Sequence, residues 1–327
     1  MKTAVITGCT GQDGSILCHQ LLGEGYLVVG AKRRTSSLNT QRIDDIYHHP
    51  NFRVEYFDLC DASSINRIIA KYKPDEYYNL AAQSHVRTSF DVPEDTINGI
   101  VMGVLYILEA IKNISPKTRL YQASSSEMIG DNPEVPKKGY TEDSKFMPAS
   151  PYGIAKVAAH NLVQNYRKSY NLHASCGILF NHESEFRGET FVTRKITMGV
   201  AKIKAGIQDN LELGNLEAYR DWGYARDYTI GMWLMLQQDD PDNYVLATGK
   251  AHSVEEFVRE TFRVAGFAED EWKKYVIIDP IYFRPQEVPY LLGDSSKARK
   301  ILDWKPKTTF KELVKIMYNH DLKELHK

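Results

Sequence analysis

Cysteine is scarce in this chain, and the few cysteines follow no pattern. The 327 residues include Cys9, Cys18, Cys60 and Cys176, and no pair has the C-x-x-C spacing of a zinc or redox site. We therefore expect free thiols in a reducing compartment rather than disulfides or a metal centre. Neither positive nor negative residues are in marked excess, and the formal net charge is −1. A protein without a global field is not expected to bind nucleic acid or a membrane surface.

Long apolar runs and targeting signals are missing as well. No hydrophobic stretch approaches membrane-spanning length, and the first three residues lead directly into a strand rather than into a signal peptide. These absences predict a cytoplasmic protein with no membrane partner. The remaining composition, 43% hydrophobic and 25% charged, is that of a globular protein, and the length exceeds what one small core needs.

The chain opens with a strand, a glycine-rich loop and a helix. Residues 4–7 are mostly apolar with β-branched members, the loop at 8–14 reads GCTGQDG, and an apolar helix follows to about residue 25. Glycines at this place permit a tight turn and bring a pyrophosphate to the helix N-terminus, where free N–H groups favour anions. The spacing is Gly-x-x-Gly-x-x-Gly rather than Gly-x-Gly-x-x-Gly. Its position after the first strand nevertheless indicates a dinucleotide site.

A basic turn follows the second predicted strand, residues 26–31. An acidic residue here would accept from the ribose 2′-hydroxyl of NAD, but residues 32–36 read KRRTS. Cations and hydroxyls suit a 2′-phosphate, because a guanidinium binds phosphate oxygens bidentately. The sequence therefore favours NADP over NAD, with a solvated basic turn as the alternative.

Strands and helices then alternate over the first 180 residues. We expect strands at 53–57, 76–80, 119–123 and 174–179, and helices at 93–112 and 151–170. This rhythm predicts an α/β fold, a Rossmann-like doubly wound parallel sheet with a smaller C-terminal substrate-binding lobe. Residues 1–180 would form the NADP-binding domain, rejoined by about 228–250, and residues 181–327 would form the second part.

The stretch from 119 to 156 carries the predicted catalytic chemistry. Ser125 and Glu127 lie just past the carboxyl end of a strand, where open α/β sheets bind ligands. A Ser-Pro pair at 150–151 predicts a helix start, which places Tyr152 and Lys156 on one helix face. An ammonium beside a phenol favours the phenolate, so we expect a lowered tyrosine pKa and an acid–base site. Among 20 tyrosines, a chance Tyr-x-x-x-Lys is also expected.

The pattern changes after residue 180. A polar segment at 181–188 precedes a predicted helix at 191–205, a strand at 210–213 and a charged loop at 214–227. A helix at 229–238 and strands at 244–247 and near 275–278 follow. Capping boxes, Ser253 with Glu256 and Thr309 with Glu312, predict two further helices. Four cations lie on predicted loops: Arg187, Lys195, Arg220 and Arg284. Each alone would be a solvated charge, but as a group they would suit a diphosphate.

Several motifs together carry a family resemblance over nearly the whole chain. They include GCTGQDGS, AAQSHV, ASSSE, SPYGIAK, GILFNHES, RGETFVTRKIT, LGNLEAYRDWGYARDY, FRPQEV and LGDSSKARKILDWKP. The chain thereby resembles the GDP-mannose 4,6-dehydratases, a group within the extended short-chain dehydrogenase/reductase family. NHES, FVTRKIT and RDWGYARDY are more specific to that group than the glycine loop or the Tyr-x-x-x-Lys pair.

The resemblance implies an NADP-dependent hydro-lyase that converts GDP-mannose to GDP-4-keto-6-deoxymannose by internal hydride transfer from C4 to C6 with loss of water. Tyr152 would take the C4 hydroxyl proton, while Lys156 would hold the ribose and tune Tyr152. Glu127 would remove the C5 proton, and Ser125 would hydrogen-bond O4. The positions that match the family's cofactor contacts are Gly8, Thr10, Gly11, Gln12, Asp13, Gly14, Arg33, Arg34, Thr35, Ser36, Asp58, Leu59, Leu80, Ala81, Ala82, Gln83, Ser84, Tyr152, Lys156, His182 and Arg187. Those that match nucleotide-sugar contacts are Ser84, Ser125, Glu127, Asn181, Lys195, Gly214, Arg220, Arg284 and Glu287.

Four places depart from the family pattern. Glu185-Phe186 replaces Pro-Arg, Ala149 replaces an arginine, Asp95 replaces a tyrosine, and the segment 268–275 is short. Two cations are lost and a carboxylate is gained near the expected pocket. Another GDP-hexose therefore stays open as the substrate, such as GDP-N-acetylglucosamine or a GDP-heptose.

Other activities also remain open. A GDP-sugar 4-epimerase or 4-ketosugar reductase would keep the Tyr–Lys pair but would not need Glu127. A non-enzymatic NADP-binding sensor would tolerate loss of Tyr152 or Lys156, and both are present. The resemblance also implies a homo-oligomer, a dimer or tetramer, with the basic turn near a subunit interface.

Overall fold

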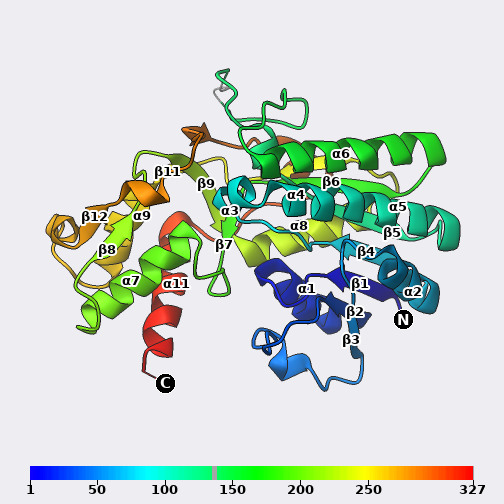
Figure 1. The fold of residues 1–327 in the computed structure, drawn as a ribbon, viewed down its shortest axis with the longest axis horizontal. Helices are drawn as coiled ribbons and strands as arrows, with labels where there is room; N and C mark the ends of the chain where they lie inside the picture. Colours follow the sequence, from blue (N-terminus) through cyan, green and yellow to red (C-terminus); the bar gives the residue numbers. More distant parts are fainter. Residues whose placement is uncertain (135–137, 327) are drawn as a thin grey trace.

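A seven-stranded parallel sheet forms the centre of the larger lobe in the computed structural model, which describes residues 1–134 and 138–326 (Figure 1). The strand order is β10-β6-β5-β4-β1-β2-β3. Because the chain builds outward from β1 in both directions, the order reverses between β1 and β4, and ligands bind at such a reversal. The bounds are β1 Thr3–Thr7, β2 Leu27–Lys32, β3 Phe52–Tyr56, β4 Glu76–Asn79, β5 Arg119–Ser125, β6 Ala174–Leu179 and β10 Asn243–Leu246.

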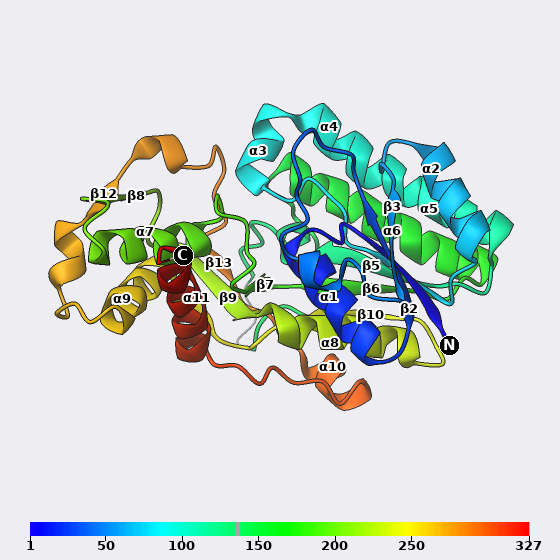
Figure 2. The same cartoon turned by 90° about the horizontal axis from the view of Figure 1, so that it is seen from below.

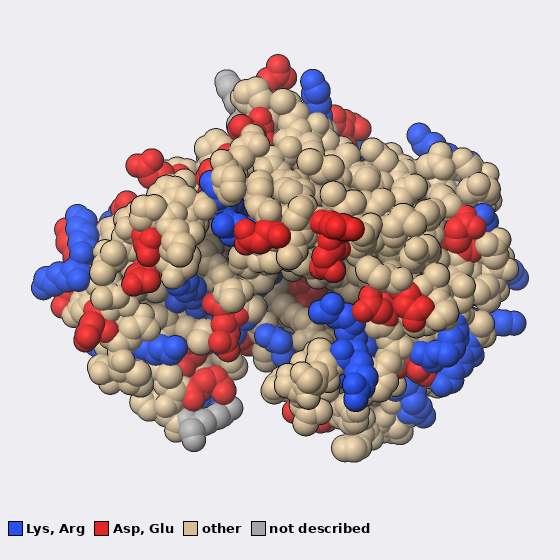
Figure 3. Space-filling model, in the orientation of Figure 1, with Lys and Arg blue, Asp and Glu red and all other residues tan. Residues whose placement is uncertain are grey.

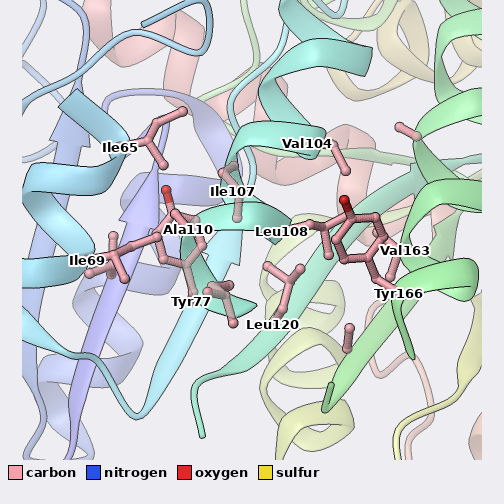
Figure 4. Packing of buried hydrophobic residues seen from close by; sticks show 14 of the residues in the cluster. Ile65, Ile69, Tyr77, Val104, Ile107, Leu108, Ala110, Leu120, Val163 and Tyr166 are labelled. Atoms are coloured by element: carbon pink, nitrogen blue, oxygen red, sulfur yellow. The ribbon is translucent and has the colours of Figure 1, made fainter. Parts of the chain in front are cut away.

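Helices cover both faces of this sheet. Alternate strand residues point to opposite faces, so Tyr77 and Leu120 pack under α2, α5 and α6 (Figure 4), whereas Tyr78 and Tyr121 pack with residues of α1 and α8. Figure 2 shows α1 and α8 side by side. Both faces are apolar, as expected for strands buried on two sides. The bounds are α1 Gln12–Gly23, α2 Ala62–Tyr72, α5 Gly103–Ile114, α6 Pro151–Tyr170 and α8 Ala225–Gln237.

A smaller lobe lies beside the carboxyl ends of these strands (Figure 1). Its central strand β9 pairs with β7, β11 and β13, and a separate parallel pair joins β8 to β12. Its core includes Trp222, Phe257 and Met317. The bounds are β7 Asn181–Glu183, β8 Leu211–Leu213, β9 Tyr219–Tyr224, β11 Ala251–Ser253, β12 Val276–Ile278, β13 Tyr290–Leu291, α7 Val192–Lys204, α9 Val254–Val264 and α11 Phe310–Glu324.

The chain passes between the two lobes more than once. After β9 it returns to the larger lobe, where β10 pairs with β6 at the edge of the central sheet. After β13 it returns again, and α10 (Ser296–Ile301) packs there through Ala298, together with Leu302 just after the helix. The last helix, α11, belongs to the smaller lobe. Each lobe is therefore built from separate segments of the sequence.

Most predicted elements are confirmed, and α6 and β6 have the expected bounds. Both capping boxes form, at Ser253 and at Thr309. The sequence did not identify α2, α3 (Val86–Asp91), α10, β7, β11, β13 or the 3₁₀ turns Asp44–Ile46, Ser126–Met128, Glu271–Lys274 and Pro280–Tyr282.

The prediction of a charged loop at 214–227 is wrong, because this stretch contains β9 and the start of α8. Three of its charges, Arg220, Asp221 and Asp227, are buried rather than solvated. Arg220 donates from Nη1 to the Val288 carbonyl at 2.7 Å, and Asp221 accepts from the Thr248 N–H at 2.8 Å. A pattern based on exposed charge could not identify such a strand.

The predicted helix at 93–112 is one continuous helix of 22 residues, Pro93–Ile114, and it corrects the expectation about long apolar runs. With a mean hydropathy of 1.4, it is long and apolar enough to cross a membrane by those two criteria alone. A core helix passes the same test, and this helix packs in the core between α2 and α6. It consists of α4 (Pro93–Ile97), a π turn (Asn98–Met102) and α5.

Candidate active site

A cavity of about 720 Å³ opens at the carboxyl ends of β1, β4 and β5 and is lined by residues of both lobes. Figure 3 shows the molecular surface hollowed between the larger lobe on the right and the smaller lobe on the left. The sequence-predicted site residues all line this cavity except Arg34 and Ser36, which are exposed outside it. The structure therefore brings the cofactor, substrate and catalytic positions to one place.

The glycine loop is shaped by close backbone contacts. Gly8 has φ +71°, and a Cβ at Gly14 would lie 2.2 Å from the Gly8 carbonyl oxygen, so both positions require glycine. Helix α1 begins after Gly11, which has no side chain to cap the first turn. Residues 10–14 line the cavity, so this uncapped helix N-terminus faces it. Such an end attracts an anion, which fits the pyrophosphate of a dinucleotide.

A partly buried ion pair links the glycine loop to the smaller lobe. Asp13 Oδ2 lies 2.8 Å from His182 Nε2, and His182 Nδ1 lies 2.7 Å from the Phe180 carbonyl oxygen. Burial acts to lower the pKa of His182, but the Asp13 carboxylate raises it overall. Burial acts to raise the pKa of Asp13, but His182 and Gln12 lower it overall. The pair therefore favours a charged imidazolium beside a carboxylate, and it sits on the cavity wall.

The basic turn after β2 is only partly directed at the cavity. Lys32, Arg33 and Thr35 of the predicted turn line it, and so does Asn39, which was not predicted. Lys32 Nζ donates to Asn39 Oδ1 at 2.9 Å, which fixes the turn next to the strand end. No carboxylate occupies residues 32–36, so the turn presents cations and hydroxyls to the cavity.

Strand β5 and helix α6 bring the four predicted catalytic residues together. Ser150 caps α6 by accepting from the Gly153 N–H at 3.0 Å, which starts the helix at Pro151 as the sequence predicted. Lys156, one turn beyond Tyr152, donates from Nζ to the Ala123 carbonyl of β5 at 2.7 Å. The two elements are therefore joined directly beside Ser125 and Glu127.

The prediction of a lowered tyrosine pKa is wrong. Burial raises the pKa of Tyr152 to about 12, the Glu127 carboxylate adds to the increase, and a hydrogen bond with Ser125 opposes it. The Lys156 ammonium lies 5.6 Å from the centre of the Tyr152 ring and is held by the Ala123 carbonyl. Burial also lowers the pKa of Lys156, to about 8. The lysine is still mostly protonated at pH 7, and Tyr152 is a neutral phenol.

Glu127 lies at one end of a chain of alternating charges. Arg284 Nη1 is 3.4 Å from Glu127 Oε1 and 3.8 Å from Glu287 Oε1, and Arg220 Nη2 is 2.9 Å from the same Glu287 oxygen. Glu127 is 7% exposed. Two guanidinium groups and a carboxylate thus form the cavity wall on the smaller-lobe side of Glu127.

Two of the predicted cations stack on aromatic rings that the sequence did not point to. The Arg187 guanidinium lies 3.7 Å from the centre of the Phe191 ring, and Lys195 Nζ lies 3.3 Å from the centre of the Tyr282 ring. A Cβ at Gly214 would lie 2.9 Å from the Tyr282 carbonyl oxygen, which explains a glycine there. Both rings line the cavity. In the sequence, Phe191 follows Arg187 closely and Tyr282 closely precedes Arg284. This proximity was the only signal that could have pointed to the two aromatic residues.

The departures from the family pattern mostly lie outside the cavity. Glu185 does not line it, and its Oε1 pairs with Arg226 Nη2 at 2.9 Å. Phe186 does not line it either, and Ala149 is buried in a small core cluster. Asp95 does reach the cavity wall. The carboxylate gained at Glu185 is therefore neutralised away from the site.

The geometry agrees with comparisons to known proteins. A family model described as GDP-mannose 4,6 dehydratase matches residues 5–317. GDP-mannose 4,6 dehydratase 2 of Arabidopsis thaliana is 52% identical, and the match covers 98% of this chain and 87% of that protein. The GDP-mannose 4,6-dehydratase of Sinorhizobium fredii is 49% identical, and the match covers 99% of this chain and 97% of that protein. The dTDP-glucose 4,6-dehydratase of Bacillus anthracis, solved with NAD, has the same fold, with a TM-score of 0.86 at 21% identity over 100% and 98% of the two chains. This chain belongs to the GDP-mannose 4,6-dehydratase family.

Proposed function

We propose that the chain converts GDP-mannose to GDP-4-keto-6-deoxymannose with loss of one water. The observation that carries this proposal is the placement of Glu127 and Tyr152 on the wall of one cavity, with Ser125 hydrogen-bonded to the tyrosine. An oxidation at C4 needs an acid–base group at the C4 hydroxyl, and an elimination needs a second base at C5. A cavity with both groups suits the two reactions in sequence.

The residues present fit a nicotinamide dinucleotide. The glycine cradle and the uncapped start of α1 suit its pyrophosphate, and Asp58 and Leu59 line the cavity beyond β3. When bound, such a cofactor supplies a reversible hydride acceptor, which a dehydratase needs because the overall reaction has no net redox change.

Tyr152 and Lys156 would act at C4. Tyr152, whose raised pKa keeps it a phenol, is placed to exchange a proton with the C4 oxygen, and Ser125 would hydrogen-bond the same oxygen. The Lys156 ammonium, anchored on Ala123, would favour the phenolate form of Tyr152 when that proton moves. Burial of both groups excludes water from this exchange.

Glu127 would act at C5 and C6. Its carboxylate, held by Arg284, would take the C5 proton that a 4-ketone acidifies, and would return it to the C6 hydroxyl as water leaves. The Arg284 and Arg220 guanidinium groups, with Lys195 further along the wall, suit the diphosphate of the nucleotide sugar. GDP-mannose is favoured over other GDP-hexoses because Glu185, Phe186 and Ala149 lie off the cavity.

Mass spectrometry of a substrate panel tests the proposal. The purified protein is mixed with a catalytic amount of NADP⁺ and with GDP-mannose, GDP-N-acetylglucosamine or a GDP-heptose in turn. We expect GDP-mannose to lose one water with no net accumulation of NADPH. Turnover of another GDP-hexose alone would change the substrate, and no turnover of any of them would overturn the proposal.

We further propose that the cofactor is NADP rather than NAD. Arg33 supports this because it lines the cavity at the end of β2, whereas its neighbour Arg34 does not. Replacing Arg33 with alanine should weaken NADP⁺ binding about tenfold or more, as expected for lost charge-assisted contacts to a phosphate, and should leave NAD⁺ binding unchanged. Calorimetry measures both affinities. Arg34→Ala is the matched control, with little expected effect, and equal affinities of the wild-type protein for the two cofactors would contradict the assignment.

A further inference from the structure

The loop at residues 184–188 presents Arg187 to the cavity. Arg187 Nε lies 3.0 Å from Glu183 Oε2, and its guanidinium stacks on Phe191. Its charge acts on both the glycine loop and the catalytic tyrosine, since it contributes to lowering the pKa of Asp13 and opposes the increase at Tyr152. Arg187 therefore lines the cavity and acts electrostatically both on the pyrophosphate cradle and on the reacting end of the site.

Two arginines outside the cavity hold the backbone of this loop. Arg194, on α7, donates from Nη1 to the carbonyl oxygens of Glu185 and Arg187, the latter at 3.1 Å. Arg42 donates from Nε to the Phe186 carbonyl at 2.9 Å and from Nη1 to the Thr10 carbonyl at 3.1 Å. Three successive carbonyls of the loop are thus bound by guanidinium groups.

Arg194 is buried and Arg42 is partly buried, so these two cations beside one loop require a compensating charge. Arg42 feels Arg194, because its pKa is lowered by burial and then by that guanidinium. Asp321 supplies the negative charge: its Oδ1 lies 2.6 Å from Arg194 Nε, and its Oδ2 accepts from Thr197 Oγ1 at 2.6 Å. Asp321 is 3% exposed and lies on α11, and it is not among the residues that line the cavity. Removing one partner of a buried pair leaves the other charge uncompensated.

We propose that Asp321, on the last helix of the chain, is a positioning residue for the cofactor site, acting through Arg194 and the 184–188 loop on Arg187. The carboxylate orients the Arg194 guanidinium so that Nη1 faces the two carbonyls, and these fix the turn that aims Arg187 into the cavity. The inference rests on the proposed function and on the contact with the dinucleotide that the family resemblance implies for Arg187, which lines the cavity.

Cofactor and nucleotide affinities measured separately test the inference. Asp321→Asn keeps the size and one acceptor oxygen but removes the charge. We expect the Kd for NADP⁺ to increase about tenfold, the scale of one charged hydrogen bond, while the Kd for GDP is unchanged. Thr197→Val, which removes only the hydroxyl that fixes Asp321, should move the Kd in the same direction by a smaller factor and serves if Asp321→Asn does not fold.

Leu313→Ala provides the matched control on the same helix. Leu313 is buried in the apolar core of the smaller lobe, so its truncation lowers the melting temperature through lost apolar packing rather than through a lost charge. If Leu313→Ala weakens NADP⁺ binding as much as Asp321→Asn does, the effect is one of general stability and the inference is overturned.

A double-mutant cycle with Arg187→Ala gives the decisive result. If Asp321 acts through Arg187, adding Asp321→Asn to Arg187→Ala should cause no further loss of NADP⁺ affinity, although it should still lower the melting temperature. Additive losses would overturn the inference. Failure of the wild-type chain to bind any nicotinamide dinucleotide would instead overturn the proposed function.

Discussion

Replacing Glu127 with glutamine should stop the loss of water while oxidation at C4 continues. Glutamine keeps the size of the side chain and an oxygen that can face Arg284, which lies 3.4 Å from the carboxylate, but it cannot take a proton from C5. We expect the rate of water loss to decrease about 10²–10⁴-fold, the usual contribution of a general base. Oxidation that is not followed by elimination should accumulate reduced cofactor on the enzyme.

Two signals separate these steps. Mass spectrometry follows the loss of water from GDP-mannose, and the absorbance of bound reduced nicotinamide follows oxidation at C4. Glu287→Gln is the control for altered charge, because Glu287 shares Arg284 with Glu127 but is separated from it by that guanidinium. Loss of water at the wild-type rate in Glu127→Gln would contradict the role of Glu127 as the base at C5.

Replacing Tyr152 with phenylalanine should abolish both steps, because no proton then leaves the C4 hydroxyl and no 4-ketone forms. The ring stays packed in the core under α5, so the fold and cofactor binding should persist. The turnover rate should decrease about 10²–10⁴-fold, without the accumulation of reduced cofactor expected for Glu127→Gln.

Tyr166→Phe is the control on the same helix. Tyr166 also packs in this core, but its hydroxyl donates to Glu109 on α5 rather than facing the cavity. Its removal should cost about 1 kcal/mol of stability and leave turnover unchanged. Comparable loss of activity in both variants would show that Tyr152 matters for packing rather than for proton transfer.

The local motifs were sufficient to place the site. A glycine loop after the first strand, a Ser-Pro cap on α6 and the strand end at Ser125 each determine local geometry through backbone chemistry, and all three formed as expected. The parallel sheet then brings these separate motifs to one edge, because parallel strands share a carboxyl end.

Properties set by burial could not be predicted in this way. The pKa of Tyr152 follows from its exclusion from water rather than from the spacing to Lys156. Buried Arg220 and Asp221 resemble a surface loop in the sequence because their backbone partners are remote in the chain. Side-chain direction at the end of β2 decides that Arg33 rather than Arg34 lines the cavity. The homo-oligomer and the cytoplasmic location stay predictions.

The return of β10 to the central sheet has a consequence for synthesis of the chain. Without residues 243–246, β6 would be an unpaired edge strand, able to recruit a strand from another molecule. The ribosome must therefore extrude α7, β8 and β9 of the smaller lobe before the larger sheet can be completed. A fragment that ends at residue 180 lacks β10, and it is therefore not a suitable isolated dinucleotide-binding domain.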